Sequence, residues 1–464
     1  MAKEFPGKDQ SMPTVIGIIF TFLGVYCLLK RRDFLLGLLI FAGIFQASSV
    51  INIGSTGVQP YYLIACLFIY SQIRDGGLRE MSTDFTGKKP LYAFCVLGVL
   101  SALFLPFVFA GMPVYGRGLT IDEGFYYRIP LHFMVASNLV QAGCLTVNVL
   151  VVSLAASGSR TSATRSFYNL SFGFLIAVII GQSAGSLVGV NVPNSIFRNN
   201  PGYAMSDEAG LSIAERVSGT YSEPSGAGAA LVIFYAGCFA EFIYGKGPAL
   251  KVILAALAIC LVRSSSSLVA AGLTSALILV FYPPIRSFFF IRKSRLFKFS
   301  GVVAAVALLF LSPVGAVLSQ YTTEKNQTLS YVHRLAADYF ALQLTGATYG
   351  LGVGLGSNRP SSFATCLLSE VGIIGAILFL IAAIQISRNA QGTDIALRWS
   401  LFGILFCKCL GGPDITDPQM WIMLALATNC ASRFRVGGSF GQRVRQGGTK
   451  GGPVGAKTEL ACGI

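Results

Sequence analysis

Charged side chains are scarce in this chain. Asp, Glu, Lys and Arg make up only 12% of its 464 residues, whereas an average soluble protein carries about 25%. The mean hydropathy is +0.66, which excludes a soluble globule. The sequence also lacks the segments of alternating polar and apolar residues that mark the strands of outer-membrane barrels, so we expect an all-α membrane protein.

Residues for metal or disulfide chemistry are also missing. There are only two histidines, and no cluster of Asp, Glu or His resembles a metal site. The 11 cysteines form no CxxC motif and no paired spacing, so we interpret them as small side chains that suit a membrane. No metal and no cofactor are therefore predicted. The sequence shows no internal repeat either, which argues against a transporter built from inverted halves.

Long apolar runs dominate what is present. They predict one polytopic domain over residues 1–431, a bundle of about 12–13 transmembrane helices. The first run is followed, not preceded, by basic residues, so it is a retained span rather than a signal peptide. The predicted spans are 13–29, 34–51, 58–71, 91–109, 131–155, 167–190, 226–243, 249–262, 268–283, 299–318, 364–386, 399–410 and 420–431.

The basic residues indicate the orientation. The net charge is +15, and most Lys and Arg residues fall in the odd-numbered turns when the N-terminus is placed outside, as the positive-inside rule expects for cytoplasmic loops. Residues 432–464 then form a basic, disordered cytoplasmic tail that is attracted weakly to anionic lipid headgroups. Because the charge has this explanation, no nucleic-acid partner is predicted.

Two segments on the predicted outer face, 191–225 and 319–363, are long enough to be functional. In the first, a short helical turn would present Arg216, whose planar fork of donors suits phosphate oxygens. Glu223 follows seven residues later and could accept a proton. A salt bridge between Arg216 and Glu223 that closes the loop is the alternative.

The second outer segment contains an amphipathic pattern between Leu329 and Gln343 that predicts a helix. Arg334 and Asp338 lie four residues apart on its polar side. They form either an ordinary intrahelical ion pair or an anion site in which Asp338 orients Arg334. His333, directly before Arg334, can serve as a base near neutral pH.

A glycine-rich stretch at 350–363 follows this helix. Its glycines let the backbone approach a ligand and expose amide donors, with Arg359 beside them. Glu370 lies about two turns into the next predicted span, where a carboxylate is expensive and indicates function. A structural pair between Glu370 and Lys408 is equally plausible.

Three residue blocks resemble those of bacterial O-antigen ligases and polymerases, the family of membrane proteins to which WaaL and Wzy belong. In the second half of the chain, these blocks keep the order and spacing of that family, including the final hairpin GGPDITDPQMW. They read RVSGTYSEPSGAGAAL (216–231), RLAADYFALQ (334–343) and YGLGVGLGSNRPSSFATCLLSEVGIIGAILF (349–379).

The resemblance implies a metal-independent glycosyltransferase of the GT-C type at the outer, periplasmic face of a bacterial inner membrane. Its substrate would be a polyprenyl-diphosphate-linked oligosaccharide, with a chain-length regulator and a flippase as candidate partners beside the membrane lipids. Arg216, Arg334 and Arg359 would bind the diphosphate, Glu223 or His333 would activate the acceptor hydroxyl, and Glu370 would support the site.

Glu-Pro-Ser in the first block favours a polymerase for O-antigen, capsule or exopolysaccharide. The alternatives are an O-antigen ligase that transfers glycan to lipid A core, and a flippase for lipid-linked oligosaccharide.

Overall fold

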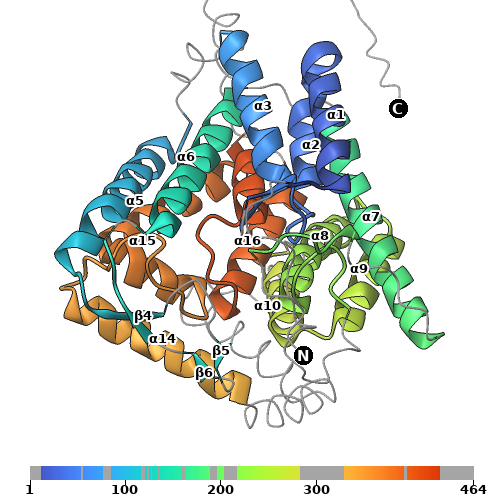
Figure 1. Cartoon of the computed structure of the whole chain (residues 1–464). Helices are drawn as coiled ribbons and strands as arrows, with labels where there is room; N and C mark the ends of the chain where they lie inside the picture. The colour runs from blue at the N-terminus through green and yellow to red at the C-terminus, as the bar shows by residue number, and fades with distance from the viewer. Residues whose placement is uncertain are drawn as a thin grey trace, which may run out of the picture.

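The protein folds as a bundle of apolar helices (Figure 1). This computed structural model describes residues 12–53, 56–76, 85–115, 121–122, 125–126, 128–133, 135–157, 162–188, 196–202, 217–282, 329–390 and 394–428. Among these residues, five helices are long and apolar enough to cross a membrane, namely α5 (Lys88–Val108), α6 (Ala136–Ser157), α7 (Ser162–Leu187), α8 (Pro224–Ile243) and α15 (Phe363–Ala390). This architecture agrees with the predicted all-α membrane class.

The other helices are shorter. They are α1 (Val15–Lys30), α2 (Leu35–Ala42), α3 (Pro60–Arg74), α9 (Ala249–Val262), α10 (Ser265–Phe281), α14 (Leu329–Ala347) and α16 (Ile395–Leu410), with a 3-10 turn η1 at Arg32–Phe34. A span over 299–318 and the tail at 432–464 lie outside the described residues, so the total of 12–13 spans stays a prediction.

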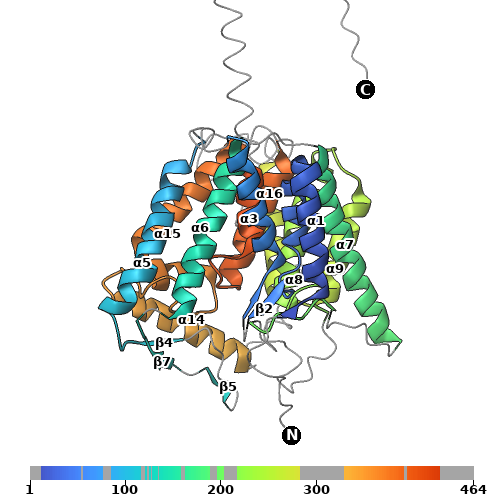
Figure 2. The same ribbon diagram turned by 45° about the horizontal axis from the view of Figure 1, so that its top comes forward.

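Short strands, which the sequence did not indicate, gather at one end of the bundle together with α14 (Figure 2). We call this end the α14 end. All the strand pairs are antiparallel. The sheets are β1 (Met12–Pro13) with β2 (Ile51–Ile53) and β3 (Thr56–Val58), β4 (Pro113–Tyr115) with β7 (Arg128–Pro130), and β5 (Ile121–Asp122) with β6 (Phe125–Tyr126).

The second predicted span, 34–51, is wrong in its latter half. Helix α2 ends at Ala42, and eight residues rise only about 12 Å, less than the apolar core of a bilayer. The chain leaves the helix because its polar groups bond elsewhere. The Ala47 N–H donates to Thr220 O at 3.3 Å, and Ser49 N–H donates to Asn199 Oδ1 at 2.9 Å.

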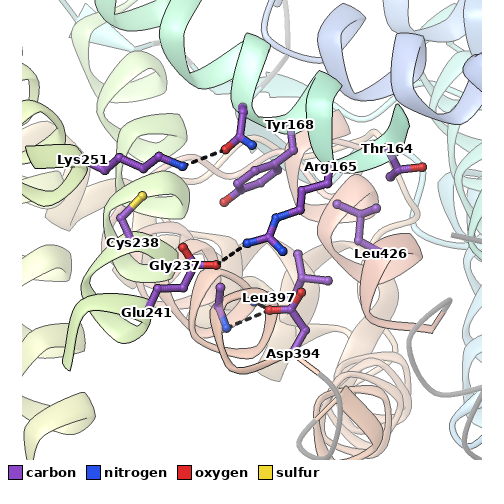
Figure 3. Close-up of a pocket in the computed structure, with 12 residues that line it drawn as sticks. Thr164, Arg165, Tyr168, Gly237, Cys238, Glu241, Lys251, Asp394, Leu397 and Leu426 are labelled. Carbon is purple, nitrogen blue, oxygen red and sulfur yellow. Dashed lines mark hydrogen bonds and ion pairs between the residues drawn. The ribbon is translucent and has the colours of Figure 1, made fainter. Parts of the chain in front are cut away.

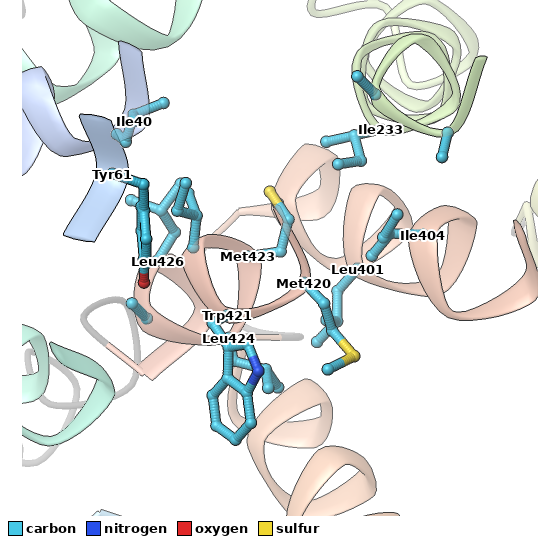
Figure 4. Packing of buried hydrophobic residues seen from close by; sticks show 14 of the residues in the cluster. Ile40, Tyr61, Ile233, Leu401, Ile404, Met420, Trp421, Met423, Leu424 and Leu426 are labelled. Atoms are coloured by element: carbon cyan, nitrogen blue, oxygen red, sulfur yellow. The ribbon is translucent and has the colours of Figure 1, made fainter. Parts of the chain in front are cut away.

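The last described helical residues, 418–428, lie at the centre of the bundle rather than facing lipid. Trp421 is fully buried, and its indole N–H donates to Ile415 O at 2.8 Å. Apolar side chains from α2, α3, α8 and α16 surround this segment (Figure 4). It is therefore a core helix that fixes the preceding segment, 411–417, at the end of α16.

Helix α15 is interrupted at Gly372. The glycine-rich stretch provides hydrogen-bond partners for the backbone groups that this break leaves free. An intact α-helix would join the Ile373 N–H to Ser369 O. Here Ile373 N–H donates to Gly350 O at 2.9 Å, while Ser369 O accepts from Val353 N–H at 2.8 Å. The stretch thus supplies both missing partners, as an apolar environment requires.

We expect Gly372→Ala to lower the free energy of unfolding by about 2–4 kcal/mol. Gly372 has φ of +75° and ψ of −179°, a region open essentially to glycine, and an added Cβ would lie 2.4 Å from Gly350 O. Thermal unfolding followed by a thiol-reactive dye, which reaches the buried Cys366 and Cys407 only after unfolding, measures the change.

Gly346→Ala is the matched control, because Gly346 lies within α14 and an added Cβ has nothing within 4 Å. That change should leave stability equal or raise it by about 0.5–1 kcal/mol. Equal melting curves for the two variants would show that the break does not constrain α15.

Candidate functional site

Buried polar side chains of α6 face the segments of the α14 end. The Asn138 amide donates to Leu355 O at 2.7 Å, and the Asn148 amide donates to Thr416 O at 3.1 Å. Between them, Gln141 Oε1 lies 2.7 Å from Thr416 Oγ1. This polar row joins the glycine-rich stretch to residues 411–417, which are far apart in sequence.

A buried ion pair closes the end of α16. Lys408 Nζ lies 2.7 Å from Asp417 Oδ2, and the two side chains are only 7% and 3% exposed. Burial raises the pKa of the Asp417 carboxyl, and the Lys408 ammonium opposes that rise. The predicted pair between Glu370 and Lys408 is therefore not formed, because residues 411–417 fold back and bring Asp417 to the lysine.

The segment 217–223 lies buried beside this pair. Gln182 holds its backbone twice, since the Gly219 N–H donates to Oε1 at 2.8 Å and Gly219 O accepts from Nε2 at 3.0 Å. The phenol of Tyr221 is fully buried, and burial followed by the charge of Asp417 raises its pKa far above the usual value.

Glu223 is the exposed member of this segment and directly precedes α8. Its Oε2 accepts from Ser225 Oγ at 3.0 Å. Arg216 and its predicted salt bridge to Glu223 lie outside the described residues. Glu223 is thus presented at the α14 end, but its predicted partner is untested.

Asp338 of α14 does not pair with Arg334. Its Oδ1 accepts from the N–H groups of Ser361 and Ser362, at 2.7 and 2.9 Å, and from Thr365 Oγ1 at 2.7 Å. The carboxylate therefore joins α14 to the residues that lead into α15. Arg334 is exposed, and no ion pair to it occurs within the described ranges. The alternative of an intrahelical ion pair is thus excluded.

The glycine-rich stretch is not an open cradle of amide donors, so that interpretation was wrong. Residues 352–358 are buried, and their backbone is used within the protein. Gly354 N–H donates to Glu370 O at 3.0 Å, and a Cβ at Gly354 would lie 2.7 Å from Ser101 O. The glycines permit close packing against α5, α6 and α15 rather than against a ligand.

Arg359 emerges from this stretch at the surface, and a second arginine lies nearby. Arg359 is exposed, while its backbone N–H donates to Tyr115 O at 2.9 Å. The Tyr115 ring lies 5.3 Å from that of Phe340 on α14, and the Arg128 guanidinium lies 4.6 Å from the centre of the same Phe340 ring. Arg128 is a candidate that sequence reasoning missed, since β7 lay where a span was expected to begin.

Glu370 and His333 occupy different environments. Glu370 is fully buried, two residues before the break in α15. His333 is half-buried on α14 next to Arg334. The structure therefore gathers Arg334, Arg359 and His333 around α14 and keeps Glu370 beneath them. Among the described residues Asp417 is also a buried carboxylate, and it was not predicted from the sequence. The Asp-x-x-Asp spacing before Pro418 was the available signal.

A small pocket lies at the opposite end of the bundle (Figure 3). Its volume of about 30 Å³ holds about one or two water molecules. Charged side chains that line it already have partners within the protein. Arg165 forms an ion pair with Glu241 at 3.4 Å, and Asp394 accepts a hydrogen bond from the Ala396 N–H at 3.0 Å. None of the predicted site residues lines it.

No group of three His, Cys, Asp or Glu side chains within the described ranges could hold a metal ion. The exposed guanidinium groups at the α14 end, those of Arg128, Arg334 and Arg359, suit an anion with several oxygens.

No family model matches the chain, and a comparison with curated proteins gives no match either. The likeness to O-antigen ligases and polymerases therefore stays a prediction that rests on the three residue blocks.

We expect Lys408→Met or Asp417→Leu alone to destabilise the protein by about 3–5 kcal/mol, because either change leaves a buried charge without its counterion. The double variant should recover much of that loss, since both charges are then removed. Thermal unfolding of the four proteins in one double-mutant cycle measures this coupling. Additive losses would mean that the two charges do not stabilise each other.

Proposed function

We propose that this protein is a membrane glycosyltransferase that extends a polysaccharide, transferring the glycan from one polyprenyl diphosphate to the sugar of another. One observation carries the proposal. Asp338 bonds to residues 361–365 instead of pairing with Arg334, so Arg334 remains available to an anion at the α14 end, where Arg359 is also exposed. Under this proposal, the α14 end faces the periplasm and the membrane is the bacterial inner membrane.

The chemistry needs little more than these groups. A diphosphate is already a good leaving group, so an enzyme must place cations where negative charge develops as the glycosidic bond to phosphate breaks. Arg334 and Arg359 serve this role, and Arg128 adds a third guanidinium beside Phe340. Charge-assisted bonds to phosphate oxygens are roughly twice as strong as neutral ones.

The acceptor hydroxyl must lose a proton as it attacks the anomeric carbon. His333 is the first candidate base, because it lies on α14 directly before Arg334. Glu223 is the second, exposed at the start of α8. Glu370 is too deeply buried to touch a sugar, so its proposed role is to support the break in α15 under Arg359. Arg216 keeps its proposed role in binding diphosphate.

The test is extension of a synthetic polyprenyl-diphosphate oligosaccharide by the purified protein in lipid. Arg334→Ala and Arg359→Ala should each slow appearance of the product ladder by about tenfold to a hundredfold, the loss of one or two charge-assisted bonds. Arg→Lys at the same positions should recover part of the rate, since a charge remains without the fork. Arg388→Ala, an exposed arginine near the C-terminus of α15, is the matched control.

Full activity of both alanine variants would contradict the diphosphate assignment. Transfer of glycan to lipid A core would instead identify a ligase, and translocation of the lipid-linked substrate without polymer growth would identify a flippase. His333→Gln and Glu223→Gln then decide between the two bases, because only loss of the base removes the rise of rate with pH.

A further inference from the structure

Helix α14 turns an apolar face away from the protein. Val332, Leu335 and Tyr339 are 54%, 60% and 63% exposed, and they follow one another at the spacing of a helix face. The opposite face, with the small residues Ala337 and Ala341, is buried. The apolar period predicted this helix from the sequence but did not show whether its apolar face meets the protein.

Exposed apolar side chains link the C-terminal end of α14 to α15, since Tyr349 and Leu351 are 91% and 49% exposed. The two helices pack on each other, and just beyond α14 the Gly350 O accepts from Ile373 N–H at 2.9 Å. From there Ile374 and Ile377, 61% and 50% exposed, begin an apolar row that follows α15. Because α15 is long and apolar enough to span a membrane, that row contacts lipid, and α14 prolongs the same surface. Figure 2 shows α14 lying across the end of α5, α6 and α15.

The flanks of α14 suit the boundary between lipid and water. Arg128 stacks over Phe340 at one flank of the apolar face, and Arg334 is exposed one turn before Ala337, on the side of the helix that faces the protein. Long basic side chains at such a boundary keep their stems on apolar surface and extend their charges to headgroup phosphates. Apolar residues on one face with basic residues beside them are typical of helices that lie in a membrane interface.

We propose that α14 is an interfacial helix whose exposed apolar face inserts into the membrane leaflet at the α14 end. Phospholipid acyl chains then cover Val332, Leu335, Tyr339 and Leu342, about 5–10 Å into the boundary between headgroups and chains. This assignment follows from surface continuity, and it holds whether or not the protein transfers glycans.

Tryptophan scanning tests this insertion directly. The chain has only two tryptophans, and both Trp399 and Trp421 are buried, so their emission is a constant background. Leu335→Trp and Tyr339→Trp are placed in vesicles of phosphatidylcholine whose acyl chains carry bromine near the headgroup end. Leu380→Trp, at an exposed position on α15, is the lipid control, and Lys246→Trp, in an exposed turn between α8 and α9, is the aqueous control.

We expect the fluorescence of the introduced tryptophan to be blue-shifted in both α14 variants. Bromine should quench at least as large a fraction of it as in Leu380→Trp. Emission like that of Lys246→Trp would overturn the proposal. Blue-shifted emission that bromine does not quench would overturn it too, since another part of the chain or a second copy would then cover the face. The substituted side chains are exposed, and unchanged thermal unfolding confirms that each variant is folded.

Discussion

The break in α15 is the constraint on which the α14 end depends. A helix interrupted within an apolar bundle leaves carbonyl and N–H groups that no solvent can satisfy. Residues 350–354 satisfy them with three backbone hydrogen bonds, from Val353 to Ser369, from Gly354 to Glu370 and from Ile373 to Gly350. The glycine at 354 is needed because a Cβ there would meet the backbone of α5 at Ser101. The glycine-rich stretch is therefore a structural part of the bundle.

The position of the exposed arginines Arg334 and Arg359 follows from these hydrogen bonds. The stretch follows α14 and carries Arg359, so the position of both is fixed once residues 350–354 are bonded to α15. Asp338 then ties α14 to residues 361–365, and β4 binds the backbone of Arg359 through Tyr115. The backbone that carries Arg334 and Arg359 is thus fixed in place, and cations positioned together suit the diphosphate leaving group of the proposed function.

Much of the fold could be predicted from hydropathy, and its failures have physical causes. Helix α9 begins and ends where the apolar run does, because Pro248 precedes the run and Arg263, in the left-handed region, ends it. The run at 34–51 failed because Ala47 and Ser49 bond to residues brought from more than 140 positions away. Lys408 was noticed as a buried charge, but its partner Asp417 required knowledge of the turn at 411–417. Arg128 was missed because strand β7 is too short to leave a pattern.

The outward apolar face of α14 shows why an apolar period is ambiguous in a membrane protein. In water, an apolar stripe must face the protein, because no other apolar phase exists. In a bilayer, protein and lipid are both apolar. The pattern therefore shows which residues share one face of the helix, but not whether that face contacts protein or lipid. Close helix packing favours small side chains, and Ala337 and Ala341 take the protein side while Leu335 and Tyr339 point outward. For these four residues, side-chain size distinguishes the two faces where hydropathy does not.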